Sequence, residues 1–282
     1  MAWSEWEPVT NMNLKEVVYH KKYRDVGGGV ARIMFNRPEK MNAMTNIGWA
    51  EIAETVLEAS NDKNIGVVVY TGAGNHFGVG GDMEWEADGG LQGPGGMALA
   101  SVPDFDGAIQ NCLKPVIAAV RGYCIGGHNH LAYHCDFTIA SDNAIFGQNG
   151  PRVASPAHGY LVASSAYVLG LRRAKEMWMV CRQYTARQAY EMDLINIVVP
   201  EAKLEEEVDR WCEDLLGLSP TCLQIVKQSF NAVGNEIKWT TDKILSLIAP
   251  DFFDRPEVKE AHDAFFNKRT PNFWKDTKKG SK

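Results

Sequence analysis

The sequence contains few cysteines, no long apolar run and no recognisable export signal. Its six cysteines are scattered, with no CxxC pair, which argues against a disulfide-stapled secreted domain and favours a reducing compartment. No stretch of 18 apolar residues occurs, and residues 1–22 contain no apolar signal core. These absences argue against a membrane-spanning protein and make a cytoplasmic location the expectation.

Positive charge is also scarce. The 282 residues include 29 Lys and Arg against 35 Asp and Glu, a formal net charge of −6, so no nucleic-acid surface is expected, although a local basic patch for a phosphorylated ligand is compatible with this balance. The chain lacks a GxxxxGK[ST] loop, and its run GVGGDM does not match the GxGxxG fingerprint of dinucleotide sites. What remains is an ordinary globular composition, 45% hydrophobic and 23% charged, in a chain long enough for one large core.

The order of apolar patterns predicts an α/β protein. Residues 30–36 and 66–72 are predicted strands, the second being a continuous β-branched run typical of a strand buried on both faces. The helix between them is expected to place Ile47, Ile52, Val56 and Leu57 on one face. The same patterns predict further strands within 114–127, 136–148 and 195–200, and helices at 102–113, from about His128, and repeatedly after Ser164. We divide the chain into a core of residues 1–200 and a helical C-terminal region of residues 201–282.

Two predicted strands are followed by glycine clusters, GVGGD at 78–82 and GG at 126–127. In α/β sheets ligands bind beyond the carboxyl ends of strands, and glycine lets backbone N–H groups approach a ligand closely. A pair of such donors suits a developing oxyanion, because it needs no reorganisation when charge appears. The alternative, that these glycines only make tight turns, stays open at this point.

Four segments, in order, resemble the crotonase superfamily, which includes enoyl-CoA hydratases and isomerases: RPEKMNAM (37–44), TGAGNHFGVGGDMEW (71–85), KPVIAAVRGYCIGG (114–127) and DFTIASDNAIFGQ (136–148). The resemblance extends from about Val17 to Phe273. It implies a crotonase-like spiral of ββα units with a helical C-terminal trimerisation region, assembled as a homotrimer or as a homohexamer, a dimer of trimers. It also implies an acyl-CoA thioester substrate and no tightly bound cofactor.

The resemblance implies roles for individual residues. The two oxyanion donors correspond to the backbone N–H groups of Gly81 and Gly127. The residues matched to CoA contacts are Lys40, Asn42, Ala43, Asp82 and, from the C-terminal region of a neighbouring subunit, Lys268. Hydratases of the superfamily use two glutamates, but the matching positions here are His130 and Gly150. Neither residue can act as a carboxylate acid or base, so hydration by the usual pair is not expected.

A closer resemblance concerns FGQNGPRVASPAHGY (146–160), the segment 172–200 and AHDAFFNKRTPNF (261–273). These are similar to 1,4-dihydroxy-2-naphthoyl-CoA synthases and 2-ketocyclohexanecarboxyl-CoA hydrolases, which perform Claisen or retro-Claisen chemistry. In the synthases a glutamine, a glycine and a tryptophan hold a bicarbonate that acts as base. Gln148, Gly150 and Trp178 match that triplet, although Trp178 is equally compatible with a core aromatic on an amphipathic helix.

Two polar groups of that branch are missing. Ser155 is present in Ser155-Pro156-Ala157, but the aspartate of the motif is replaced by Ala157, and Phe253 stands where the branch has a tyrosine. His158 follows directly and is a candidate base for activating water, the alternative being a loop histidine with one structural hydrogen bond. Camphor-ring diketone hydrolases carry a histidine and an aspartate that align approximately with His128 and His158.

A metal site is the less favoured interpretation of the histidines. His130 and His134 are four residues apart on a predicted helix, a spacing that can chelate, but no third ligand is evident. We therefore predict no metal. The favoured function is hydrolytic ring opening of an alicyclic β-ketoacyl-CoA through a thioester enolate. The alternatives are hydration or isomerisation of an unusual enoyl-CoA, a Claisen-type naphthoyl-CoA synthase, and a non-catalytic acyl-CoA binder.

Overall fold

The computed structural model describes residues 2–90, 105–155, 157, 159–241 and 244–274. The strands are β1 (Glu7–Pro8), β2 (Val17–Tyr23), β3 (Gly29–Phe35), β4 (Ile65–Gly72), β5 (Val116–Val120), β6 (Tyr123–Ile125), β7 (Phe137–Ser141), β8 (Ile145–Gly147), β9 (Gln183–Thr185) and β10 (Ile197–Val199). The helices up to α10 are η1 (Pro38–Lys40), α1 (Asn46–Asn61), α2 (Met83–Trp85), η2 (Glu86–Gly90), α4 (Phe105–Asn111), α5 (Gly127–His134), α6 (Gly150–Val153), α7 (Tyr160–Ala163), α8 (Ser165–Leu169), α9 (Leu171–Val180) and α10 (Ala186–Glu191). After them come η4 (Glu201–Lys203), α11 (Leu204–Leu216), α12 (Pro220–Thr241), α13 (Ile244–Ile248), η5 (Phe252–Asp254) and α14 (Pro256–Phe266).

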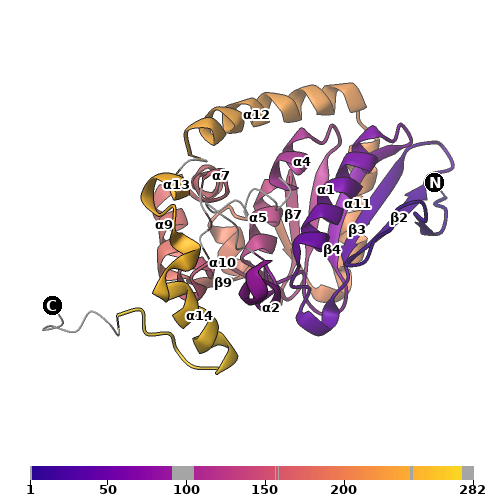
Figure 1. Cartoon of the computed structure of the whole chain (residues 1–282). Coiled ribbons are helices and arrows are strands. Elements are labelled where there is room, and N and C mark those ends of the chain that lie inside the picture. Colours follow the sequence, from indigo (N-terminus) through magenta and orange to yellow (C-terminus); the bar gives the residue numbers. More distant parts are fainter. Residues whose placement is uncertain (1, 91–104, 156, 158, 242–243, 275–282) are drawn as a thin grey trace, which may run out of the picture.

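Two sheets form the core of the fold. The larger has seven strands in the order β1-β2-β3-β4-β5-β7-β10, of which β3 to β10 pair in parallel and β1 and β2 add antiparallel at one edge. The smaller has the order β6-β8-β9. The first five strands thus all lie in the larger sheet, and only after β5 does the chain pass between the two sheets. Helices pack around the sheets, as Figure 1 shows. The α/β class predicted from the sequence is confirmed.

Strand β4 is buried on both faces, as its continuous apolar run predicts. One face packs against α1 and the other against α11, whose buried residues Leu204, Val208, Cys212 and Leu215 lie in one cluster with Val67 and Val69. Part of the helical C-terminal region thus packs directly on the large sheet. The boundary placed at residue 200 stays a prediction.

The predicted buried face of α1 is partly wrong. Ile52 and Val56 are buried, but Ile47 is 39% exposed and Leu57 61% exposed. The buried stripe is instead Trp49, Ile52, Val56 and Ala59. Its spacings of three and four residues keep the side chains on one face, whereas Leu57, one residue after Val56, is turned about 100° away.

Strand β2 was not predicted, because Lys21 and Lys22 interrupt its apolar pattern. Both lysines are nevertheless buried. Lys21 forms ion pairs with Glu58 and Asp62, each at 2.7 Å, and Lys22 pairs with Asp209 at 2.6 Å. These partners satisfy the buried cations, so the strand forms despite its polarity.

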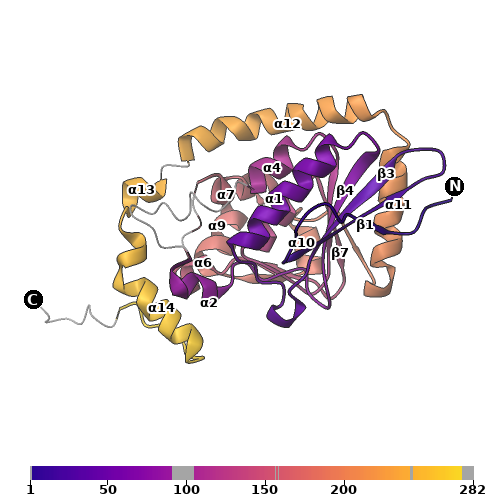
Figure 2. The same ribbon diagram turned by 45° about the vertical axis from the view of Figure 1, so that its right-hand side comes forward.

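The helices after α11 extend away from the sheets. Figures 1 and 2 show α12 running along one edge of the molecule above α4 and α7, with α13 and α14 on the side that carries the C-terminus. Several large apolar side chains of α12 and α13 are exposed: Ile225, Val226, Phe230, Val233, Leu247 and Ile248. Among the described helices none is both long enough and apolar enough to cross a membrane.

Candidate active site

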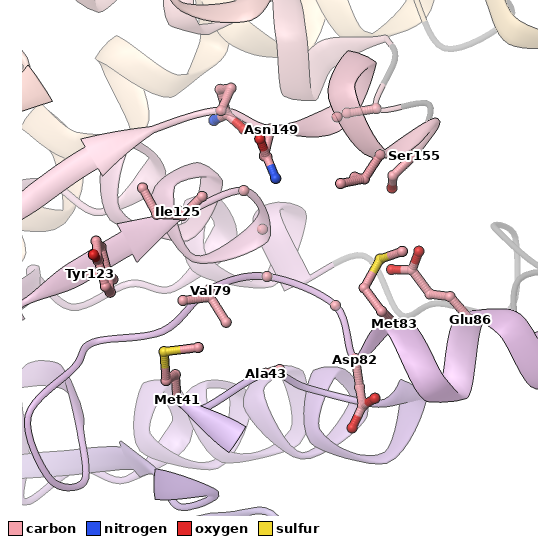
Figure 3. A pocket seen from close by; sticks show the side chains of 18 of the residues that line it. Met41, Ala43, Val79, Asp82, Met83, Glu86, Tyr123, Ile125, Asn149 and Ser155 are labelled. Carbon is pink, nitrogen blue, oxygen red and sulfur yellow. The ribbon is translucent and has the colours of Figure 1, made fainter. Parts of the chain in front are cut away.

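A cavity of about 490 Å³ opens between the loop after β4 and the start of α5 (Figure 3). Such concave pockets at strand ends are the usual location of ligand sites. Nine of the residues predicted for the site line it: Lys40, Ala43, Gly81, Asp82, Gly127, Gln148, Gly150, Ser155 and Trp178.

The loop after β4 presents the backbone of Gly81 to this cavity. Met44 N–H donates to the carbonyl of Gly80 and Asp82 N–H donates to the carbonyl of Met44, each at 2.9 Å. These bonds fix the peptides on both sides of Gly81. Within the described part of the chain no backbone carbonyl accepts the Gly81 N–H, so it is available to a ligand.

The second donor lies at the first residue of α5. Gly126 adopts φ +61° and its N–H donates to the carbonyl of Gly147 at 3.1 Å. Gly127 begins the helix, so its N–H has no intrahelical acceptor, and none of the described backbone carbonyls takes it. A Cβ on Gly80 would lie 3.2 Å from Gly127 N. The two glycine segments therefore touch, and both residues border the same cavity, an arrangement compatible with an oxyanion site.

The His128 side chain does not line this cavity, contrary to the sequence-based assignment. Its ring is fully buried and packs against Phe35, Trp49 and Phe77. Burial lowers the pKa of His128 to about 3, so the ring is neutral. Its Nδ1 accepts the N–H of Gly80 at 3.0 Å. His128 thus supports the glycine loop from behind rather than contacting a ligand.

His130 and Gln148 form a buried polar pair on the cavity wall. His130 Nε2 and Gln148 Oε1 are 3.1 Å apart. Burial lowers the pKa of His130 to about 4, so the ring is neutral at pH 7, and Nε2 carries the proton because an amide oxygen only accepts. Among the described residues none hydrogen-bonds to Gln148 Nε2, which is buried. That amide is a donor left for a ligand.

Gly150 and Trp178 line the same cavity as Gln148, so the three residues of the predicted triplet lie together. Trp178 Nε1 donates to Ser165 Oγ at 3.0 Å, so its indole N–H is already used. Its ring lies against His130, with centroids 5.1 Å apart. A Cβ on Gly150 would lie 2.6 Å from the carbonyl oxygen of Ser155, so only glycine fits there. Of the two polar side chains, that of Trp178 has no donor left, whereas Gln148 Nε2 has no hydrogen-bond partner among the described residues.

Ser155 lines the cavity, and its N–H donates to the carbonyl of Gly150 at 3.0 Å. His158, the predicted base, lies outside the described residues. Its role therefore stays a prediction.

The residues predicted to bind CoA divide into three groups. Lys40 and Ala43 line the cavity, and Lys40 pairs with Glu84 at 2.8 Å. Asn42 is fully buried and donates to the carbonyls of Ala73 and His76, so its side chain holds the loop rather than facing a ligand. Lys268 lines a neighbouring hollow that shares residues with this cavity.

Asp82 borders the cavity but points its carboxylate away from it (Figure 3). It accepts the N–H of Glu84 at 2.9 Å as the N-cap of α2 and pairs with Arg37 at 2.8 Å. Burial alone would raise the pKa of Asp82, but the hydrogen bond and charge of Arg37, together with the N–H groups of Glu84 and Trp85, outweigh burial and lower it. Asp82 is thus an ionised, structurally engaged carboxylate.

Glu86 is the residue that sequence reasoning missed. It lines the cavity, is only 8% exposed, and burial with the nearby charge of Asp82 raises its pKa to about 7. The only sequence signal was a glutamate five residues after Gly81, in a segment whose acidic residues resemble those of any solvated loop. No group of three His, Cys, Asp or Glu side chains that could hold a metal occurs among the residues the structure describes.

The protein is thus of the α/β class, with a cavity bordered by two glycines, Gly81 and Gly127, whose N–H groups have no backbone acceptor among the described residues. The sequence profile of the family described as Enoyl-CoA hydratase/isomerase matches residues 25–277. The chain belongs to this family, the crotonase superfamily, and is a crotonase-type acyl-CoA enzyme.

Solved structures agree with this assignment. An enoyl-CoA hydratase/isomerase from Pseudoalteromonas atlantica T6c is 26% identical, with 92% of this chain and 100% of that one covered at a TM-score of 0.77. An enoyl-CoA hydratase/isomerase from Xanthobacter autotrophicus Py2 is 27% identical. The match covers 92% of this chain and 100% of that one, with a TM-score of 0.76. An enoyl-CoA hydratase from Mycobacterium avium subsp. paratuberculosis K-10 is 26% identical. The match covers 92% of this chain and 99% of that one, with a TM-score of 0.74. The crotonase fold predicted from the sequence is confirmed.

Proposed function

We propose that the protein hydrolyses a carbon–carbon bond of an alicyclic β-ketoacyl-CoA by retro-Claisen ring opening. One observation carries the proposal. The donors Gly81 and Gly127 border a cavity in which His130 and Gly150 occupy the positions of the usual hydratase carboxylates. An oxyanion hole without that carboxylate pair suits a reaction that generates a thioester enolate by bond cleavage.

In this reaction the oxygen of water attacks the ring ketone carbon, and the bond from that carbon to the α-carbon breaks. The electron pair moves into the thioester enolate, whose oxygen accepts the N–H groups of Gly81 and Gly127. The ketone carbon becomes a carboxylic acid and the α-carbon takes up one proton. The unpartnered Nε2 of Gln148 supports a role in holding the ketone oxygen, and no tightly bound cofactor is needed.

The experiment that tests this function is mass spectrometry of the purified protein incubated with 2-ketocyclohexanecarboxyl-CoA and, separately, with crotonyl-CoA. We expect a gain of one water on the ketone, giving the open-chain dicarboxylic thioester. Water gained only by crotonyl-CoA would overturn ring opening. Reaction with neither compound, together with intact CoA binding, would favour a non-catalytic binder.

Hydration or double-bond isomerisation of an unusual enoyl-CoA is the second candidate. Two observations favour it: the solved structures of similar sequence are described as enoyl-CoA hydratases or isomerases, and Glu86 supplies a buried carboxyl group elsewhere in the cavity. The crotonyl-CoA arm of the experiment above decides between the candidates. Claisen-type synthase activity and a bound bicarbonate have less support, because Trp178 already donates to Ser165.

A homotrimer or a dimer of trimers is part of the same proposal. The exposed apolar side chains of α12, among them Phe230 at 77% exposed, support burial against another copy. Light scattering coupled to size exclusion should give three or six times the 31.3 kDa of the chain, and Phe230→Asp should dissociate it. A monomeric wild-type protein would contradict the assembly. A cytoplasmic location is also proposed, supported by cysteines that are all free.

A further inference from the structure

We propose that Glu86 is the proton-transferring residue of this cavity, delivering a proton to the carbon next to the thioester carbonyl and removing one from it. The assignment rests on the proposed enolate function and adds to it the group that supplies and accepts the proton. It differs from the sequence-based hypothesis, in which His158 or a bicarbonate is the candidate base.

The position of Glu86 relative to Gly81 is the first argument. A Cβ placed on Gly81 would lie 2.2 Å from Oε1 of Glu86, so the carboxyl group lies directly against the backbone of the first oxyanion donor. A thioester oxygen bound by the Gly81 N–H places the neighbouring α-carbon on the same side. Figure 3 shows the Glu86 side chain beside Met83, on the side of the cavity where Ser155 lies and opposite in direction to Asp82.

The lack of local partners is the second argument. Glu86 begins η2, and its backbone N–H donates to the carbonyl of Asp82 at 2.9 Å, which fixes the start of the side chain. No hydrogen bond or ion pair joins its carboxyl group to any residue within the described ranges, although its exposure is only 8%. A buried carboxyl group without a structural partner carries a cost in free energy that a catalytic role explains.

The charges around Glu86 explain why its proton can move near neutral pH. Asp82 lies on the same loop and is ionised through Arg37. Glu84 is exposed and paired with Lys40, and His130, on the opposite side of the cavity, is neutral. Burial and the negative charge of Asp82 together raise the pKa of Glu86 to about 7. A proton-transferring group is most effective when its pKa is close to the working pH.

The proton balance closes in both candidate reactions. In ring opening the Glu86 carboxylate takes a proton from the attacking water while the ring bond breaks. The resulting acid then protonates the α-carbon of the enolate, which restores the carboxylate. In isomerisation the same group removes a proton at one carbon of the substrate and returns it at another. No oxidant or further reactant is required.

The test measures proton transfer without bond cleavage. Wild-type protein, Glu86→Gln and the control Glu54→Gln, an exposed glutamate on α1, are incubated with butyryl-CoA in deuterated water. Deuterium at the α-carbon is then followed by mass spectrometry. We expect Glu86→Gln to slow the exchange about 100-fold or more, while Glu54→Gln leaves it unchanged. Calorimetric titration should show similar affinity of all three proteins for butyryl-CoA.

A pH series makes the test specific to proton transfer. The wild-type exchange rate should rise with pH and level off above about 7, because the carboxylate is the active form, and Glu86→Gln should lose this inflection. Exchange that is absent from the wild type, or that keeps its rate and inflection in Glu86→Gln, would overturn the inference. Failure to open the ketone ring while exchange depends on Glu86 would refute only the proposed function, and ring opening that survives in Glu86→Gln would refute only the role of Glu86.

Discussion

The two sides of the cavity bury different kinds of titratable group, and this difference organises the site. The first wall, residues 79–86, contains Glu86. The second wall, residues 126–130 together with 148–150, contains His130. Burial shifts both residues toward their neutral forms, raising the pKa of Glu86 to about 7 and lowering that of His130 to about 4. Of these two buried groups, Glu86 therefore has its pKa near neutral pH, whereas His130 stays neutral there.

The two glycines, one in each wall, also differ in what surrounds them. A Cβ on Gly127 would lie 2.7 Å from the ring of Trp49, which is itself stacked on Phe105. A Cβ on Gly81 would meet the carboxyl end of Glu86, which can rotate away. The donor of the second wall is thus rigidly packed, and that of the first wall is coupled to the proton-transferring side chain.

The largest predicted effect is that of Gly127→Ala. Because the added methyl group cannot displace the stacked Trp49 ring, the start of α5 must shift and its N–H must leave the cavity. We expect kcat/KM to fall by about 10²–10³, the usual loss for one oxyanion donor. Steady-state kinetics on the substrate identified by mass spectrometry measures it.

The matched variant is Gly81→Ala. It should displace Glu86 rather than the backbone, and so alter the pH profile as well as the rate. If kcat/KM of Gly81→Ala and Gly127→Ala depended on pH in the same way, the proposed difference between the two walls would be wrong.

The second prediction concerns the stability of Glu86→Gln. The folded protein holds the Glu86 proton up to about pH 7, whereas the unfolded chain releases it near 4.5. Raising the pH through this window therefore lowers the free energy of unfolding of the wild type, by up to about 3 kcal/mol. Glutamine does not titrate, so the variant does not lose this free energy. Its stability relative to the wild type should therefore increase as the pH rises from 4.5 to 8. Urea unfolding at both pH values checks it, and a difference that is constant with pH would contradict the burial of Glu86.

The sequence indicated the two glycine clusters that border the cavity but not the buried glutamate. The glycine pair is visible in the sequence, and the structure explains both members: Gly126 adopts φ +61°, and a Cβ on Gly127 would lie 2.7 Å from the Trp49 ring. Glu84 and Glu86 are two residues apart in the same acidic run, yet the side chain of Glu84 is 64% exposed while Glu86 is buried. Both line the cavity. Which of the two side chains is buried depends on how the first wall packs, and the local sequence does not determine that packing.

The histidines illustrate the same limit. His128 and His130 lie two residues apart on α5, so they point to different sides of the helix. His130 faces the cavity, whereas His128 faces the core and binds the Gly80 N–H. The motif predicted that the segment was functional, but the direction of each ring required the packing of Phe35 and Trp49 around it.

The third prediction concerns His130, for which the free energy of unfolding should change with pH in the direction opposite to that predicted for Glu86. His130 is neutral when folded and gains a proton near pH 6.5 when unfolded, so acidification favours the unfolded chain. Between pH 7 and pH 5 this lowers the free energy of unfolding by about 2 kcal/mol. His130→Gln, which can still hydrogen-bond to Gln148, should lose that part of the acid sensitivity, as measured by urea unfolding at the two pH values. Glu54→Gln serves as the control, and an unchanged pH dependence of His130→Gln would show that the ring is not buried neutral.

The smallest predicted effect concerns the exposed end of the cavity. Lys40 and Glu84 form a pair whose charges remain largely in solvent, so salt screens them strongly. If Lys40 contacts a CoA phosphate, Lys40→Ala should weaken binding of CoA by about two- to five-fold at low salt, as for other exposed ion pairs. Calorimetric titration at low and high salt measures it, with dephospho-CoA as the matched ligand. A loss that persists at high salt would mean that Lys40 is shielded from solvent when CoA is bound. Unchanged binding of both CoA and dephospho-CoA in Lys40→Ala would remove Lys40 from the CoA site.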